Sequence, residues 1–186
     1  MPKIKLSPLS LILIPIVMLD PSGEIAATVI AAVLHELGHL AVILICRIGV
    51  KEITVTPYGL EILTCRKYRS FIEEIAVNSA GCTVNFATYM LLSGKAGFAA
   101  YIASSSVILG ALNVLPVLSL DGGETLRAIF ELLFPFRVSE KLSRFISFIT
   151  VLMLWCCAAY IFLFSGYNYS LFVMSVWLFG KIYCLK

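Results

Sequence analysis

The chain has 186 residues, of which 60% are hydrophobic and 13% are charged, and its formal net charge is +3. Soluble domains are closer to half apolar and about a quarter charged, so this composition excludes an ordinary soluble globule and predicts a polytopic membrane protein. The small net charge indicates no nucleic-acid partner. We expect one membrane-embedded domain over residues 1–186, with its core spans at about 24–134, because no linker or repeat divides the chain.

Six apolar segments follow one another along the chain, at residues 6–19, 24–46, 71–93, 96–119, 142–165 and 169–185. Four of them are long enough to cross about 30 Å of hydrocarbon at about 1.5 Å per residue; the first and the last are shorter. Lys3 and Lys5 resemble the start of a signal peptide, but no small-residue cleavage site follows, so 6–19 is predicted to be a retained span. The expected fold is all-α, with about six transmembrane helices.

Residues 51–65 depart from the helical pattern. EITVT and LEILT alternate, are rich in β-branched residues and flank PYG, which predicts a small β-hairpin. A plain connector between helices is the simpler interpretation. The functional alternative is an edge strand that holds an unwound substrate segment by strand addition.

The basic residues are distributed unevenly across the predicted membrane. If six spans alternate, thirteen of the 14 Lys and Arg residues lie on one side, and only Lys95 lies on the other. This bias predicts a multi-pass cell-membrane protein with both termini and the hairpin in the cytoplasm.

The pentapeptide HELGH, residues 35–39, lies near the middle of the 24–46 span. His35 and His39 are four residues apart and share one helix face, which is the spacing of two ligands in a tetrahedral zinc site. Glu36 can then act as general base on a water activated by the metal. Single histidines in membrane helices often only bond to a neighbouring helix, but both histidines of this chain fall in this one motif.

A catalytic zinc site needs a third protein ligand, and the candidates are acidic. Asp20 and Glu24 have the pattern of helix-start residues, and Glu73 and Glu74 can pair with a basic loop. Asp121 differs, because it follows a proline-broken span in NVLPVLSLDGG, residues 113–123. It could instead be a turn residue or the N-cap of a helix over 122–134.

These motifs resemble the site-2 protease family of intramembrane zinc metalloproteases. HELGH, the N-x-x-P…L-D-G-G stretch, and SAGCTVN at 79–85, which matches a G-x-x-x-N pattern, carry the resemblance over roughly residues 30–127. The compact layout is most similar to the bacterial branch that includes a sporulation-factor-processing protease. The resemblance implies one Zn²⁺ per chain held by His35, His39 and Asp121, with Glu36 as catalytic base, and a membrane-associated protein substrate cleaved in or near its transmembrane segment.

Two positions depart from the family pattern. A second proline is common where this chain has Leu118, and an arginine commonly follows DGG where this chain has Glu124, with Arg127 at the next basic position. A helix counted from Lys95 would also carry Asp121 about 39 Å along, close to the cytoplasmic surface. The chain must therefore start this span deep, tilt it, or fold back after Pro116.

Other polar residues have two interpretations each. Asn85 and Asn113 either bond to neighbouring helices or hold the substrate backbone and a developing oxyanion. The six cysteines form no CxxC motif and are interpreted as small apolar residues, although a Cys82 thiolate could also bind zinc. The alternative functions are a zinc transporter, which would not need Glu36 in this register, and a catalytically silent zinc-binding scaffold, which would normally lose a ligand or the base, whereas none is lost here.

Overall fold

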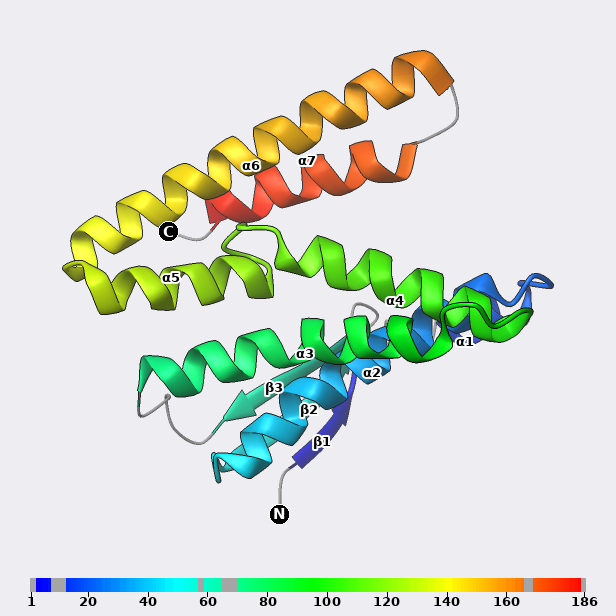
Figure 1. The fold of residues 1–186 in the computed structure, drawn as a ribbon, viewed down its shortest axis with the longest axis horizontal. Helices are drawn as coiled ribbons and strands as arrows, with labels where there is room; N and C mark the ends of the chain where they lie inside the picture. The colour runs from blue at the N-terminus through cyan, green and yellow to red at the C-terminus, as the bar shows by residue number, and fades with distance from the viewer. Residues whose placement is uncertain (1–2, 8–12, 57–58, 65–69, 166–168, 185–186) are drawn as a thin grey trace. The chain divides into compact units, whose positions relative to one another are not determined.

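The computed structural model of the chain describes residues 3–7, 13–56, 59–64, 70–165 and 169–184 (Figure 1). These residues form seven helices and three strands, and the chain divides into two compact units, Met1–Asn113 and Val114–Lys186. Each unit is described by itself below.

The first unit is built around a close pair of helices. Its helices are α1 (Leu13–Met18), α2 (Glu24–Ile45), α3 (Phe71–Leu92) and α4 (Phe98–Val114). Small residues let α2 and α3 approach each other, because a Cβ atom added at Gly38 would lie only 2.9 Å from the carbonyl oxygen of Ala80. This close approach places the polar middle of α2 directly against α3.

Both ends of α2 are satisfied locally. Asp20 accepts hydrogen bonds from the Ser22 hydroxyl and from the backbone N–H of Ile25, and these bonds hold the pKa of Asp20 below its ordinary value. At the other end Arg47 adopts a positive φ of 53°, and the N–H of Ile48 donates to the carbonyl of Ile43 at 2.9 Å. The prediction that Asp20 is a helix-start residue is therefore confirmed.

The predicted hairpin is present and belongs to a three-stranded sheet. Strand β2 (Val50–Thr56) pairs antiparallel with β3 (Gly59–Thr64), and β1 (Lys3–Leu6) pairs parallel with β2, in the order β1-β2-β3. Lys5 and Glu52 form an ion pair of 2.7 Å across β1 and β2.

The first predicted span, residues 6–19, is not seen as one membrane-length helix. Leu6 belongs to β1, and α1 has six residues, or roughly 9 Å; residues 8–12 lie outside the described part of the chain. The apolar pattern concealed the strand, because KIKL finds its pairing partner more than forty residues away in β2.

The sheet is joined to the helix pair by an apolar cluster. Ile43, Ile48 and Val77 are buried together, and Val50 of β2 and Ile62 of β3 pack against them. The inner face of the hairpin therefore rests on the last turns of α2, about one turn beyond His39.

The second unit contains three helices, α5 (Asp121–Leu133), α6 (Phe136–Ser165) and α7 (Tyr169–Cys184). Helix α6 packs along α7 and contacts α5 (Figure 1). Val117, Val151 and Leu178 form its buried core, so the loop before α5 is anchored between the two long helices.

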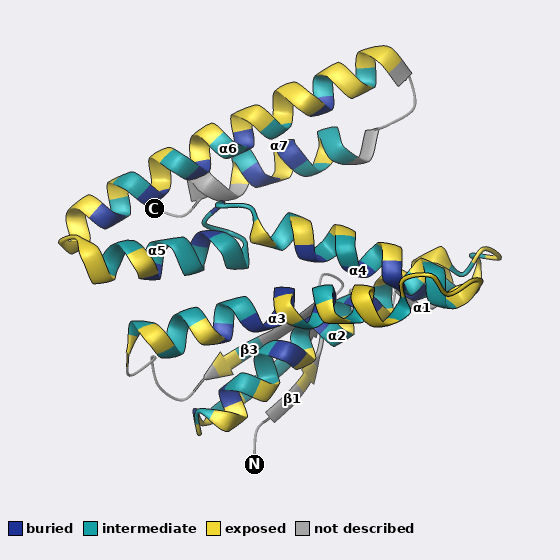
Figure 2. Cartoon of the chain, viewed as in Figure 1, coloured by how far each residue is buried: buried dark blue, intermediate teal, exposed yellow. Residues whose placement is uncertain are grey.

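Three helices are long and apolar enough to cross a membrane, namely α2, α3 and α6, and α4 and residues 171–180 of α7 are shorter apolar helices. Six spans are thus not shown among the described residues. Much of the surface of these helices is exposed (Figure 2). The exposed residues include the large apolar residues Leu44, Met90, Phe145, Leu163 and Val173. An apolar exterior of this kind is consistent with a lipid environment.

Candidate metal centre

The two histidines of HELGH converge on a single point. His35 is buried, and its Nε2 atom lies 3.1 Å from Nε2 of His39, with the two rings nearly perpendicular at 81°. Two nitrogens that bind one tetrahedral zinc ion at about 2.0–2.1 Å lie roughly 3.3 Å apart. The spacing of the two Nε2 atoms is therefore close to that of a shared ion.

The backbone of α3 fixes the ring of His39. Its Nδ1 atom lies 2.7 Å from the carbonyl oxygen of Val77. Because a carbonyl oxygen only accepts, Nδ1 must carry the proton, and Nε2 of His39 keeps a lone pair for a metal. This contact could not be predicted from the sequence, since it uses a main-chain group of an apolar residue.

Gly81 leaves the space in which the two rings meet. A Cβ atom at this position would lie 2.5 Å from Nε2 of His39 and 2.6 Å from Cε1 of His35. No other residue type fits here without moving a ring. The G-x-x-x-N pattern marked Gly81 in the sequence, but it did not show that the glycine faces the histidines.

Glu36 is next to His35 in the chain, and Cys82 lies close to His35 in space. Glu36 lies on α2 and is half-buried. Cys82 is buried on α3, and its sulfur lies within 4.8 Å of a ring nitrogen of His35. Since thiolates also bind zinc, Cys82 is a candidate for the third ligand from within this unit.

The two asparagines singled out in the sequence have different surroundings. Asn85 of α3 is fully buried, and its Nδ2 atom lies 3.1 Å from Nδ1 of His35. Asn113 is half-buried and donates from Nδ2 to the carbonyl of Leu109 in its own helix. Only Asn85 is thus brought to the histidine pair.

Asp121 belongs to the second unit, where it is half-buried and occupies the first turn of α5. The loop before it returns the chain to the end of α4, because Cβ atoms at Gly122 and Gly123 would each lie 2.1 Å from a carbonyl oxygen, of Val114 and Val117 respectively. Of the three alternatives that the sequence left open for this span, the structure shows the third, in which the chain folds back after Pro116. Asp121 therefore begins α5 beside the last residue of α4 rather than many turns further on.

A residue of α6 secures this loop. The buried Ser147 accepts a hydrogen bond from the N–H of Leu118 at 3.0 Å and donates to the carbonyl of Pro116 at 3.3 Å. Leu118 stands where the family commonly has a second proline, which has no N–H to donate. The hydroxyl of Ser147 thus accepts a hydrogen bond from the backbone N–H that Leu118 has and a proline would lack.

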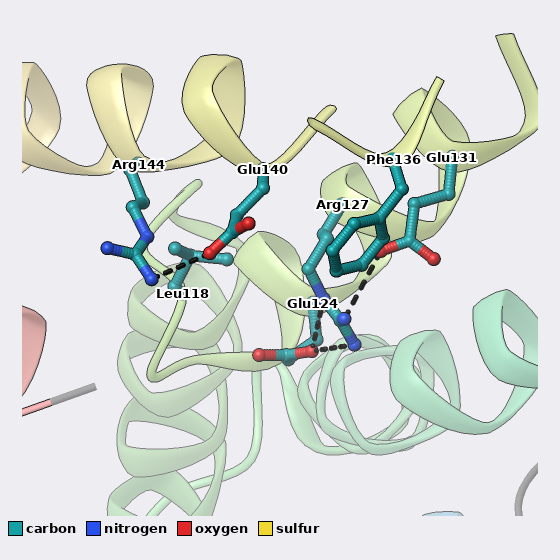
Figure 3. Close-up of a pocket in the computed structure, with 7 residues that line it drawn as sticks. All are labelled: Leu118, Glu124, Arg127, Glu131, Phe136, Glu140 and Arg144. Carbon is teal, nitrogen blue, oxygen red and sulfur yellow. Dashed lines mark hydrogen bonds and ion pairs between the residues drawn. The ribbon is translucent and has the colours of Figure 1, made fainter. Parts of the chain in front are cut away.

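A charged pocket of about 270 Å³ lies beside the same loop (Figure 3). Arg127 pairs with Glu124 at 2.7 Å and with Glu131 at 3.3 Å, and Arg144 pairs with Glu140 at 2.7 Å. The second departure from the family pattern is therefore balanced within α5, where Glu124 and Arg127 neutralise each other. The full lining comprises Leu118, Glu124, Arg127, Glu131, Phe136, Glu140 and Arg144.

The residues of the first unit fit a zinc ion. Two imidazole nitrogens point at one place, a backbone carbonyl sets the tautomer of one ring, and the glycine leaves room. Two protein ligands leave positions for a carboxylate or thiolate and for water, which is the composition of a catalytic zinc site.

Residues 89–157 match the model of peptidase family M50. The matched stretch runs from the end of α3 into α6 and includes Asn113, Pro116 and Asp121, but it does not include the two histidines. No curated protein has a significant match to the sequence.

Among solved structures, the fold is similar to that of the site-2 protease from Methanocaldococcus jannaschii. The TM-score is 0.67 at 21% sequence identity, and the alignment covers 96% of this chain and 88% of that chain. The chain thus has the fold of that protein over almost its whole length.

Proposed function

We propose that the chain is an intramembrane zinc metalloprotease that cleaves membrane-associated proteins in or near a transmembrane segment. The observation that carries this proposal is the convergence of the His35 and His39 Nε2 atoms beside Glu36 on a long apolar helix. The M50 match supplies the peptidase class, and the similar fold supplies the membrane setting. Within the site-2 protease family, the compact layout of the chain favours the bacterial branch that includes the sporulation-factor-processing protease.

The proposed ligands are His35, His39 and Asp121, with one zinc ion per chain. Asp121 is the third ligand on the grounds of its sequence motif, and the glycines that follow it let α5 begin beside the end of α4. We prefer a carboxylate to the Cys82 sulfur because the LDGG stretch lies within the M50 match and because a buried Cys commonly serves only as a small apolar residue.

The reaction is hydrolysis of a peptide bond. A zinc ion in this site would supply Lewis acidity, which acidifies water and polarises the scissile carbonyl. Glu36 takes a proton from the attacking water, whose oxygen bonds to the carbonyl carbon, and then delivers that proton to the nitrogen of the amine as the C–N bond breaks.

An extended substrate segment would pair with the sheet. Among the described residues, strand β3 forms one edge of the sheet. Ile62 of β3 packs against the apolar cluster that contains Ile43 of α2. A helix that unwinds could therefore lie along the outer edge of β3 and reach the histidine pair nearby.

Replacing Glu36 by Gln tests the proposal. The native chain is co-expressed with single-span membrane reporters until one is cleaved, and Glu36→Gln is then compared for cleavage and for zinc content of the purified protein. We expect bound zinc to be retained and cleavage to fall by about 10²- to 10⁴-fold, because the proton carrier is lost. Glu24→Gln, at the exposed start of the same helix, is the matched control and should cleave normally.

Unchanged cleavage by Glu36→Gln would remove this residue from the mechanism. Zinc bound by a native chain that cleaves no reporter would favour the scaffold or transporter instead. If the protein is a transporter, zinc would also cross the membrane of vesicles into which the protein has been reconstituted.

A further inference from the structure

The inference concerns the carboxamide of Asn85, whose contact in the structure is with a ring nitrogen of His35. Asn85 is fully buried, and Gly110 of α4 closes over it, because a Cβ atom at Gly110 would lie 3.3 Å from Cβ of Asn85. The side chain is thus enclosed between α2 and α4, with its amide against Nδ1 of His35 at 3.1 Å.

The structure permits two hydrogen-bond networks around His35. In the first, the Asn85 amide N–H₂ donates to Nδ1, so Nε2 of His35 carries the proton and donates to Nε2 of His39 at 3.1 Å. In that arrangement the proton on Nε2 of His35 lies between the two Nε2 atoms, where a metal ion would otherwise bind. This network is therefore the one expected for the protein without a metal.

In the second network the amide is turned by about 180°, a change that leaves the positions of its heavy atoms nearly the same. The Oδ1 atom of Asn85 then accepts a proton from Nδ1 of His35, and Nε2 of His35 is free to bind a metal. Within the described residues Oδ1 has no hydrogen-bond partner, so turning the amide breaks no other bond of this oxygen.

His39 already has the arrangement that the second network gives to His35. Its Nδ1 faces a group that can only accept, the carbonyl of Val77. Metal-binding histidines usually donate their second ring N–H to a carboxylate or a carbonyl, which fixes the tautomer and raises ligand basicity.

We propose that Asn85 is a positioning residue: its carboxamide oxygen accepts the Nδ1–H of His35 and so holds this ring in the tautomer that binds a divalent metal. The proposal rests on the metal site of the proposed function, and it assigns Asn85 to the histidine rather than to the substrate.

Two substitutions of Asn85 and one control test which atom of its carboxamide matters. Asn85→Asp has the same shape and offers only acceptor oxygens when ionised, whereas Asn85→Leu is similar in volume and offers none. Thr88→Val, one turn along α3, removes a hydroxyl that bonds only within its own helix, to the carbonyl of Val84, and is the matched control.

The measurement is zinc affinity of the purified full-length chain, by competition with a chromophoric chelator, together with the visible absorption spectrum of the Co²⁺-loaded protein. We expect Asn85→Leu to weaken zinc by about 10- to 100-fold and to alter the Co²⁺ spectrum. Asn85→Asp and Thr88→Val should keep the affinity within about threefold of the native value. Circular dichroism checks that each variant keeps its helices.

Two results would overturn the inference: an Asn85→Leu variant with native zinc affinity, or an Asn85→Asp variant that is as weak as a folded Asn85→Leu. If Asn85→Leu fails to fold, the comparison of Asn85→Asp with the native chain still decides, because an amide that must donate cannot be replaced by a carboxylate. Failure of the proposed function would give a different result. The native chain and the Asn85 variants would then show the zinc affinities expected above, but the native chain would cleave no substrate.

Discussion

Gly81 decides how closely the third helix can approach the two histidines. A methyl group at this position would lie 2.5 Å from Nε2 of His39 and 2.7 Å from Nε2 of His35, well inside van der Waals contact. In Gly81→Ala one of the rings must therefore turn away, and the two nitrogens can no longer share one ion. We expect zinc affinity to fall at least about 10-fold and cleavage to be lost, with the helical content unchanged.

Gly180→Ala is the control for this substitution. Gly180 also lies within a helix, but a Cβ atom there would have no neighbour within 4 Å, so alanine should leave zinc affinity and cleavage at native levels. The explanation from crowding would be wrong if Gly81→Ala bound zinc as tightly as Gly180→Ala does.

Some residues of the site could be predicted from the sequence, and others could not. The closeness of His35 and His39 could be predicted, because a spacing of four residues on a helix puts two side chains on one face whatever the rest of the chain does. The carbonyl of Val77 and the clearance at Gly81 depend on how α3 packs on α2. Such packing involves residues some forty positions away and leaves no local pattern.

At the scale of elements, continuous apolar runs predicted the positions of helices closely where polar or charged residues stand at both ends of the run. The predicted segments 24–46 and 71–93 correspond to α2 (Glu24–Ile45) and α3 (Phe71–Leu92). The segment 96–119 became the shorter α4 because Pro116 and the glycines after Asp121 divert the chain. The strand β1 was missed because its partner is distant in sequence.

The loop before α5 offers a stability prediction. Ser147 satisfies the N–H of Leu118 and the carbonyl of Pro116, and both lie in a loop whose Val117 is completely buried. Ser147→Ala would leave these groups without that partner, at a cost of about 1–3 kcal/mol. We expect a lower melting temperature in detergent and faster proteolysis within residues 115–120.

Ser143→Ala is the matched control on the same helix. Ser143 is also buried, but its hydroxyl has no hydrogen-bond partner in the described part of the chain, so its removal should be neutral or slightly stabilising. Equal melting temperatures for the two alanine variants would show that Ser147 does not secure the loop.

At the scale of the whole molecule, the sheet connects two separate observations on orientation. The charge distribution places the N-terminus and residues 47–70 on one side of the membrane. Independently, β1 pairs with β2, so residues 3–6 and 50–56 lie in one sheet of the first unit and belong on the same side. The N-terminal part of the predicted topology thus has support from strand pairing, whereas the count of six spans does not follow from the described helices.

The remaining prediction is the orientation of the chain. The turn at residues 93–97, between α3 and α4, carries Lys95, the single basic residue predicted to lie outside. If the α4–α5 segment, α6 and α7 each cross once, the C-terminus returns to the side of the sheet, where basic residues gather. In a bacterial host we expect alkaline phosphatase inserted after Lys95 to be active, and green fluorescent protein fused after Lys186 to fluoresce, because each reporter works on only one side of the membrane. If alkaline phosphatase were active when fused after Lys186 in place of green fluorescent protein, the number of crossings between the sheet and residue 186 would be odd. Helix α7 would then be the first to remove from the set of spans, since with 16 residues it is the shortest of α3, α4, α6 and α7.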